Sequence, residues 1–464
     1  MSQVPSLTAT HVYHHATCEH RVRLDLFGDA ALRLPDTGTE GALKALGLAH
    51  EAAIAVARDY PRPTHGHDDL PRAFEETLAL MREGREGIYQ GVLVSDGLIG
   101  MPDLLVCQEG PSRLGAHHYT VGDVKISRRA RSDQALQVAF YAHLLGLVQG
   151  RIPERLFLQL GDGREEWFAY EDVGGAFEQV LADLVALREG RRETEAFLQP
   201  ACSACPWRGL CLGELEARGD LSLVPGMTPS RRRALRRANV ATVAELAGEK
   251  AERLEAASGL EAPSLTLLVR QARALAEDRP MPIGRPHRPP GPPELLVTAL
   301  ENSTGDGHTV LLTISFTDPR EGPRTALLWS EDPADEKALF EKALIAFSRK
   351  PDAPVYHYGP SAPSQLARME ARHGAGDRGL ASLDRLTDVA AWVKRAAALP
   401  LNAYTLDAAA RATGHPGSDS VGDVLPDVFR LEEGDGGAKA RLLAAADAER
   451  EAIRHLLEWL RRNP

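Results

Sequence analysis

The chain has 464 residues, of which 43% are hydrophobic and 26% are charged. These proportions are typical of globular proteins, and the length predicts two to four domains. No apolar run is long enough to cross a bilayer, so we expect no membrane association through a transmembrane helix. Residues 1–13 lack a basic region followed by an apolar core, which predicts a cytoplasmic protein without a signal peptide. The net charge of -11 argues against a surface coated with basic groups, although a local basic groove remains compatible with it.

Helical patterns come first along the chain. Hydrophobic residues recur at helical spacing over residues 41–60, a segment that carries His50 and Glu51. A second helical pattern covers residues 72–85.

The period then changes to two, which is typical of strands. Asp96-Gly97 is a strong signal for a two-residue hairpin turn between strands at 89–94 and 98–107. The following elements are expected to be a strand, a helix, two edge strands and a helix, at 118–126, 133–147, 156–160, 166–170 and 173–195. Strands framed by helices predict an α/β or α+β domain.

The second half begins with short helices around tight turns, at 221–247, and a further helix at 264–277. Residues 279–293 are rich in proline, which predicts an interdomain linker. Strands at 294–300 and 309–316 then open a last segment, with helices expected at 334–348, 364–373, 389–398 and 438–462. The predicted domains are therefore 1–215, 216–278 and 294–464, with the linker at 279–293.

Two acids and a lysine on the predicted strands form a candidate catalytic site. Asp123 and Lys125 are two residues apart on a strand, so their side chains point to the same face, and Asp103 lies on the neighbouring strand. Carboxylates suit hard divalent cations such as Mg²⁺ or Mn²⁺, which lower the pKa of an attacking water. Lys125 can stabilise developing negative charge. Gln137 and Tyr141 share a helix face and can hydrogen-bond the lysine or a DNA backbone, although Tyr141 also fits a plain core position.

The order P-D, D-x-K, Q-x-x-x-Y resembles the RecB-like branch of the PD-(D/E)xK nucleases. Each motif alone is weak, since surface Asp and Lys are common; their order on strand, strand and helix carries the resemblance. It implies a restriction-endonuclease-like mixed sheet flanked by helices, with His50, Asp103 and Asp123 as metal ligands. A lone helical histidine is more often a packed or surface residue, and Glu51 is expected to be a surface acid or to lie outside the metal ligands.

Cysteines crowd together at the end of the predicted first domain. Cys202, Cys205 and Cys211 lie in C-x-x-C followed by five residues and C, and Cys18 supplies a fourth thiolate if the two ends of the domain meet. Thiolates suit an iron–sulfur cluster or zinc. The arrangement, with Trp207 inside it, resembles the 4Fe–4S staple of AddB-type and CRISPR-adaptation nucleases, which favours the cluster over Zn²⁺. Cys107 lies on an apolar strand and is expected to be a buried small hydrophobe.

Residues 221–247 resemble a helix-hairpin-helix element. In that motif the hairpin, here with Gly226, offers backbone N–H groups to a DNA phosphate. Five arginines follow, and we expect them to contact DNA: Arg231, Arg232, Arg233, Arg236 and Arg237. The alternative is that they form a solvated helix face.

Residues 294–464 weakly resemble an RNase H-like, 3′–5′ exonuclease-type domain, through V-Y-H-Y-G-P, L-T-D-V and Y-T-L-D. Active members carry an acid pair on the first strand, where this chain has Thr298 and Leu300. Asp388 matches a later acid, and His357 lies in the right phrase without being a carboxylate. We therefore expect a degenerate α/β domain that binds or supports nucleic acid.

Together these features predict a metal-dependent deoxyribonuclease acting on single-stranded ends or flaps in recombination, repair or foreign-DNA processing, with a helicase or other repair subunit as a possible partner. One alternative is a non-catalytic DNA-binding or scaffold subunit that keeps the fold for docking. Another is an RNA-processing nuclease whose C-terminal domain reads the substrate.

Overall fold

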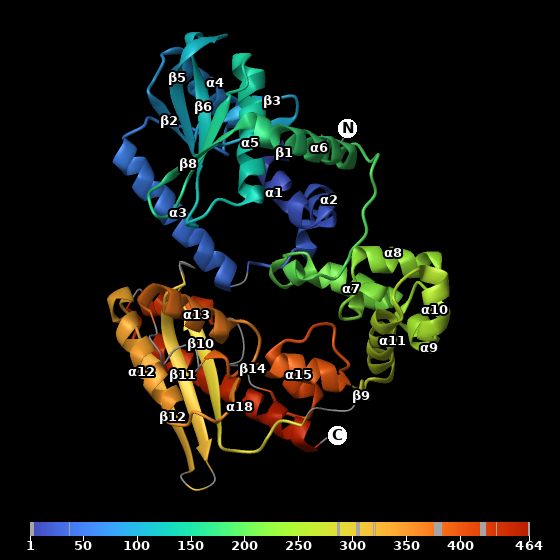
Figure 1. Ribbon diagram of the computed structural model, residues 1–464. Coiled ribbons are helices and arrows are strands. Elements are labelled where there is room, and N and C mark those ends of the chain that lie inside the picture. The colour runs from blue at the N-terminus through green and yellow to red at the C-terminus, as the bar shows by residue number, and fades with distance from the viewer. Residues whose placement is uncertain are drawn as a thin grey trace. The chain divides into compact units, whose positions relative to one another are not determined.

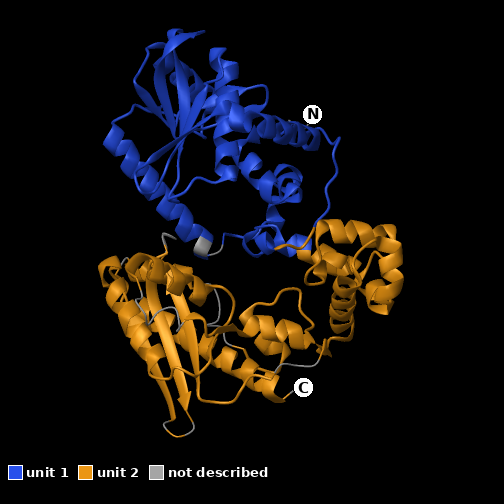
Figure 2. Cartoon of the chain, in the orientation of Figure 1, with its two compact units in different colours: residues 1–196, 200–211 blue, residues 197–199, 212–464 orange. Residues whose placement is uncertain are grey.

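The computed structural model describes residues 4–36, 38–284, 288–302, 307–318, 320, 322–374, 383–417, 424–432 and 434–462. Helices and several mixed sheets alternate along it, which confirms the predicted α/β class (Figure 1). The chain divides into two units, residues 1–196 with 200–211, and residues 197–199 with 212–464 (Figure 2). No described helix combines the length and hydropathy that crossing a bilayer requires.

A five-stranded mixed sheet forms the centre of the first unit. Its strands lie in the order β2 (Gly87–Tyr89), β5 (Leu104–Ser112), β6 (Gly115–Val124), β7 (Arg155–Gln159) and β8 (Glu165–Ala169). β5 and β6 are antiparallel, whereas β6 and β7 are parallel. A parallel pair needs a crossover connection, which here is the helix α5 (Ser132–Gln149).

Helices cover both faces of this sheet. On one face, α1 (Ala9–Thr17), α5 and α6 (Tyr170–Arg188) share a hydrophobic core with alternate residues of the strands. On the other face, α3 (Gly38–Arg58) packs Ile54 and Ala55 against Leu104, Val124 and Phe157. The shorter α2 (Glu19–Phe27) and α4 (Leu70–Arg82) complete the helices of the unit.

A small three-stranded sheet lies beside the main one. In it, β3 (Leu93–Ser95) and β4 (Leu98–Gly100) form a hairpin, and β1 (Leu7–Thr8) pairs parallel to β4. Asp96 and Gly97 both have positive φ, 51° and 72°, as the predicted two-residue turn requires. The hairpin is confirmed, but its second strand ends at Gly100, and β5 starts again at Leu104 in the other sheet.

The helix α7 (Arg208–Arg218) spans the division between the units, and the second unit continues with a helical part. Its elements are η3 (Leu221–Leu223), α8 (Pro229–Arg237), α9 (Val243–Gly248), α10 (Ala251–Ser258) and α11 (Ala262–Glu277). The predicted linker at 279–293 is not wholly a linker, because β9 (Met281–Pro282) pairs with β15 (Ala397–Ala398). Proline is compatible with so short an edge strand.

The remainder of the second unit is a five-stranded sheet between helices. The strand order is β12 (Gly322–Trp329), β11 (Thr309–Asp318), β10 (Glu294–Glu301), β13 (Val355–His357) and β14 (Leu386–Asp388). β10 to β12 are antiparallel neighbours, and β13 and β14 continue parallel to β10. One core includes α12 (Glu336–Ser348) and α13 (Ser361–His373); another includes α15 (Val389–Ala396), α16 (Leu406–Ala412) and α18 (Ala438–Arg462). α17 (Leu425–Glu432) packs through Val428 against α18.

Candidate functional site

Asp103 and Asp123 lie opposite each other on neighbouring strands. Leu104 of β5 pairs with Gly122 of β6, and continuing this antiparallel register by one residue places Asp103 beside Asp123. Asp103 is 8% exposed and Asp123 is 3% exposed. The backbone N–H of Val124 donates a hydrogen bond of 2.7 Å to Oδ2 of Asp103, which fixes one carboxylate against the strand that carries the other.

Lys125 joins this acid pair to α5. Its Nζ forms an ion pair with Oδ2 of Asp123 and donates a hydrogen bond of 3.1 Å to Oε1 of Gln137. Its backbone N–H donates to the carbonyl of Gln159, which extends the β6–β7 pairing and holds the lysine in register. Burial alone would lower the pKa of Lys125, but the charge and ion-pair contact of Asp123, together with the charges of Asp103 and Glu51, outweigh burial and raise the pKa. The ammonium group is therefore charged at neutral pH.

Glu51 brings a third negative charge to the site. Burial raises the pKa of Asp103 well above its usual value, and the charges of Asp123 and Glu51 raise it further. Burial and Asp123 raise the pKa of Glu51 as well. Without a metal, burial and mutual repulsion therefore favour the neutral forms of Asp103 and Glu51, whereas a bound divalent cation would favour their ionised forms. Among the described residues, the ligand atoms of this site do not form a group of three within 4.8 Å of one another. From the sequence we expected Glu51 to be a surface acid or to lie outside the metal ligands. Its position beside His50 on a helix did not indicate that it would lie near Asp103 and Asp123.

His50 lies on α3 next to Glu51. Its Nε2 is buried and forms no hydrogen bond with any residue that the structure describes. Of the residues on α3, Glu51 is the one whose charge raises the pKa of Asp103. The ligand role expected of His50 stays a prediction.

Two tyrosines border the acids. Tyr141 belongs to the core under the sheet, and its hydroxyl is hydrogen-bonded with Gln137. Its pKa is raised well above the usual value by burial first and then by Asp123 and Asp103. Tyr89 on β2, which the motifs did not indicate, has its pKa raised by burial, Glu51 and Asp103. Tyr141 is thus a core residue whose polar end faces the site.

The four candidate cluster cysteines are half-buried and come from two segments far apart in sequence, Cys18 in one and Cys202, Cys205 and Cys211 in the other. Cys18 separates α1 from α2, Cys202 and Cys205 lie around η2 (Pro200–Ala204), and Cys211 lies in α7. Burial raises the pKa of Cys205, and Cys202 and Cys18 are near enough to raise it further. Among the described residues, no three of these sulfurs lie within 4.8 Å of one another. Thiolates on one zinc ion lie about 3.8 Å apart, so the thiols are not arranged as a preformed zinc tetrahedron.

Hydrogen bonds hold the two ends of the first unit together beside these cysteines. Trp207 is 2% exposed, and its Nε1 donates a hydrogen bond of 2.7 Å to Oδ1 of Asp25. The N–H of Leu34 donates to the carbonyl of Pro206 over 2.8 Å. The meeting of the two ends, on which a fourth ligand from Cys18 depends, is therefore present.

The hairpin before α8 is a tight turn that requires its glycine. Met227 N–H donates to the carbonyl of Val224, and Gly226 has φ +83°, the geometry of a turn with proline and then glycine at its centre. Thr228 caps α8 by accepting a hydrogen bond from the N–H of Arg231. Nη1 of Arg231 in turn donates to the carbonyl of Gly226 over 2.6 Å.

The five arginines do not all lie on one solvated face of α8, since Arg232 is buried and Arg231 and Arg236 are half-buried. Arg232 is 8% exposed, and it donates to Asp220 over 3.2 Å and lies over the ring of Phe197. Arg236 also donates to Asp220, over 3.1 Å. Burial alone would raise the pKa of Asp220, but its hydrogen bonds with Ser222 and the charge of Arg232 keep it below its usual value. Both arginines thus balance a buried carboxylate, and Arg232 is too buried to reach DNA.

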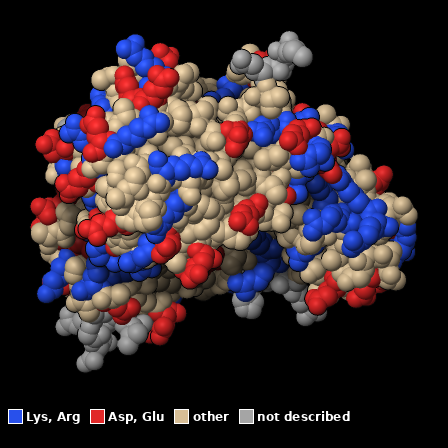
Figure 3. Space-filling model, turned by 90° about the horizontal axis from the view of Figure 1, so that it is seen from above, with Lys and Arg blue, Asp and Glu red and all other residues tan. Residues whose placement is uncertain are grey.

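Arg233 and Arg237, in contrast, are exposed on α8. Lys and Arg side chains gather densely on the surface of the helical part (Figure 3). These two residues are the arginines of the set that solvent, or a phosphate, reaches most readily.

The candidate acid positions of the C-terminal sheet hold residues with structural roles. The hydroxyl of Thr298, 2% exposed, is hydrogen-bonded to that of Thr313 on β11. Oδ1 of Asp388 accepts hydrogen bonds from the N–H groups of Ala390 and Gly359. His357 is hydrogen-bonded through Nδ1 to the carbonyl of Gly359. The described residues place no cluster of three metal-ligating side chains in this part.

No protein-family model matches the chain, and no curated protein shows significant similarity to it.

Proposed function

We propose that this protein is a metal-dependent nuclease that hydrolyses phosphodiester bonds in DNA. The observation that carries the proposal is the buried pair Asp103 and Asp123, with the ammonium group of Lys125 held beside it. The resemblance to RecB-like nucleases supports the same chemistry. The proposed substrate is DNA with single-stranded ends or flaps.

The chain's own residues have separate roles in this proposal. Asp103 and Asp123 would hold Mg²⁺ or Mn²⁺, with Glu51 or His50 from α3 as further ligands. The bound metal would polarise the phosphate and activate a water. Lys125 stabilises the negative charge that develops on the phosphate. Gln137 is a positioning residue that keeps the lysine in place.

The cysteines are proposed to hold a 4Fe–4S cluster, with zinc as the alternative. Four iron atoms occupy more space than one ion, so thiolates around a cluster lie farther apart than those around zinc. The cysteine thiols lie near one another but too far apart for a zinc tetrahedron, so their spacing suits a 4Fe–4S cluster better than a single zinc ion. Such a group would join the ends of the first unit and contribute to its folding.

Nucleic acid is proposed to bind the helical part through the Gly226 hairpin and the exposed Arg233 and Arg237. The C-terminal domain is proposed as a non-catalytic support, since Thr298 and Asp388 are engaged in structural hydrogen bonds. The net charge of -11 restricts DNA binding to such local basic surfaces.

The test is cleavage of labelled single-stranded DNA, duplex DNA and RNA by anaerobically purified protein with Mn²⁺ or Mg²⁺. Lys125→Ala and Asp123→Asn are expected to slow DNA cleavage by about 100-fold or more. Asp162→Asn, at an exposed carboxylate paired with Arg164, is the matched control and should cleave at the wild-type rate. Equal cleavage by Lys125→Ala would remove the site, cleavage of RNA alone would favour the RNA-processing alternative, and no cleavage by the wild type would favour a scaffold.

A further inference from the structure

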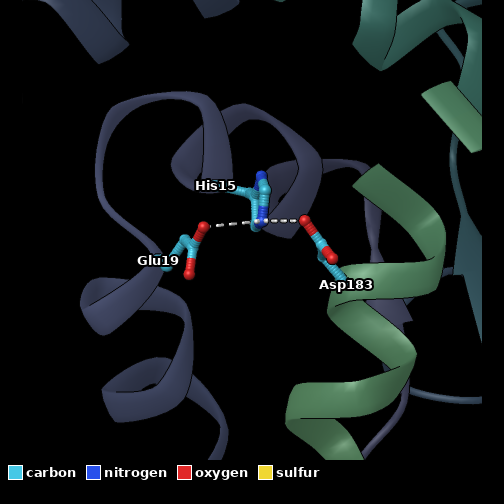
Figure 4. Close-up of side chains that lie close together, drawn as sticks. All are labelled: His15, Glu19 and Asp183. Carbon is cyan, nitrogen blue, oxygen red and sulfur yellow. Dashed lines mark ion pairs between the residues drawn. The ribbon is translucent and has the colours of Figure 1, made fainter. Parts of the chain in front are cut away.

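Three side chains outside the proposed nuclease site converge between helices of the first unit. His15 lies near the end of α1, Glu19 begins α2, and Asp183 lies on α6 (Figure 4). Nε2 of His15 is 3.7 Å from Oε1 of Glu19 and 3.6 Å from Oδ2 of Asp183. All three ligand atoms lie within 4.8 Å of one another.

The imidazole points a buried nitrogen at the two carboxylates without bonding to either. The side chain of His15 is 10% exposed, and its Nε2 forms no hydrogen bond with any described residue. Separations of 3.6 and 3.7 Å are too long for hydrogen bonds. A buried nitrogen of this kind needs a partner, and the spacing leaves room for one between the three side chains.

Arg192 holds both carboxylates in place through hydrogen bonds. It donates two hydrogen bonds to Glu19, over 2.7 and 3.1 Å, and one of 2.9 Å to Oδ1 of Asp183. Gln179 donates to the same oxygen, so Asp183 presents Oδ2 to the histidine. Two carboxylates and one arginine leave one net negative charge facing the imidazole. Partners that orient carboxylates in this way are a regular feature of metal sites.

We propose that His15, Glu19 and Asp183 bind a divalent transition metal ion, for which Zn²⁺ is the probe. Ligand atoms at zinc bond lengths in a tetrahedron lie about 3.4 Å apart, so the separations of 3.6 and 3.7 Å need to close by only a few tenths of an ångström. An imidazole and two carboxylates form a donor set that such ions accept, with water in the remaining position.

The ion would connect α1, α2 and α6, and its effect is therefore on stability rather than on cleavage. Its presence does not depend on the proposed nuclease activity. Since Glu19 follows Cys18 directly, the ion would also restrain the segment that carries that cysteine.

The experiment measures the number of zinc ions bound per chain in the full-length protein carrying Asp123→Asn, a substitution expected to abolish metal binding at the proposed nuclease site. His15→Gln and Asp183→Asn, each added to this background, are expected to lose one equivalent in equilibrium dialysis. Asp162→Asn added to the same background is the control and should lose none. The zinc-dependent rise of the unfolding temperature should disappear with the two cluster variants and persist with the control.

Glu19→Gln is a second test in case the His15 and Asp183 variants do not fold. Glu19 is 36% exposed and should tolerate substitution better than these more buried positions. The substitution should weaken zinc binding about 10-fold or more. Unchanged stoichiometry and an unchanged thermal shift in folded His15→Gln or Asp183→Asn protein, or unchanged affinity in Glu19→Gln, would overturn the proposal.

Discussion

The side-chain amide of Gln137 accepts a hydrogen bond of 3.1 Å from the ammonium group of Lys125. This contact joins the crossover helix α5 to the end of β6, where Lys125 is also ion-paired with Asp123. Two partners from different elements therefore restrain a long, flexible side chain. In the proposed mechanism, that restraint holds the positive charge where the phosphate would develop negative charge.

Gln137→Met tests this positioning role. Methionine keeps the length of the side chain but is a much poorer acceptor, so we expect kcat to fall about 10-fold, equivalent to roughly 1.4 kcal/mol, with little change in KM. Gln137→Glu should restore most of the rate, because a carboxylate again accepts from Lys125. Single-turnover cleavage of labelled DNA separates the two parameters. A parallel loss in both variants would show that Gln137 does not act through the lysine.

Asp103→Asn should stabilise the metal-free protein. Folding raises the pKa of the Asp103 carboxyl, which in the unfolded chain is about 3.9. Between those two pKa values the folded state binds more protons, so wild-type stability decreases as pH rises through this window, and the loss is complete above the folded pKa. Asparagine cannot ionise and can still accept from Val124 N–H. The free energy of unfolding of Asp103→Asn, measured in EDTA at neutral pH, should therefore exceed that of the wild type by about 0.5–2 kcal/mol.

Denaturant unfolding across pH measures that difference. It should vanish below the unfolded pKa, where both side chains are neutral. Mn²⁺ should stabilise the wild type and leave Asp103→Asn unchanged. A variant less stable than the wild type in EDTA at every pH would contradict the role of Asp103 as a buried acid.

Local patterns predicted the approximate positions of the helices and strands after residue 38, since period and turn residues are local properties, but they missed α1 and α2 and joined β4 with β5. The Asp96-Gly97 hairpin is an example, because both turn residues adopt the positive φ that their types favour. The same-face placement of Asp123 and Lys125 follows from the strand period alone. Glu51 and Tyr89 could not be predicted in this way, because their proximity to Asp103 depends on how α3 and β2 pack.

The arginines of α8 show the same limit. The sequence contains a run of positive charge, but it does not reveal that Asp220 is buried at 3% exposure and attracts two members of that run. Helical periodicity separates Arg233 and Arg237 from Arg232 and Arg236 only once the buried face is known. That face is set by the packing of α8 against η3 and α10, which no local pattern contains.

Cys205→Ser is expected to yield colourless and less stable protein if the four cysteines hold an iron–sulfur cluster. Losing one thiolate weakens a group that joins both ends of the first unit. The measurements are visible absorbance, iron content and the unfolding temperature of anaerobically purified protein. Cys107→Ser is the matched control, since Cys107 lies on β5 apart from the set and should leave the colour unchanged. Full colour in Cys205→Ser would contradict the assignment.

Trp207→Phe tests the contact between the ends independently of the thiols. The substitution removes the hydrogen bond to Asp25 from an indole that is 2% exposed. We expect a loss of about 1–3 kcal/mol in the free energy of unfolding, because Asp25 loses a donor at a partly buried position. Denaturant unfolding of the full chain measures it. A change within about 0.5 kcal/mol, the range of ordinary surface substitutions, would show that this hydrogen bond does not stabilise the unit.

Arg233→Glu with Arg237→Glu should weaken binding of single-stranded DNA without affecting folding. Both side chains are exposed, so charge reversal leaves the helix intact while removing contacts with phosphate. If both touch the backbone, the slope of log affinity against log salt should fall by about 0.7 per contact. Arg232→Glu should act differently, because it places a carboxylate beside buried Asp220 and costs roughly 3–5 kcal/mol of stability. Fluorescence anisotropy in an Asp123→Asn background measures binding without cleavage, and circular dichroism measures folding. An unchanged salt slope in the folded double variant would exclude this face of α8 as the DNA contact.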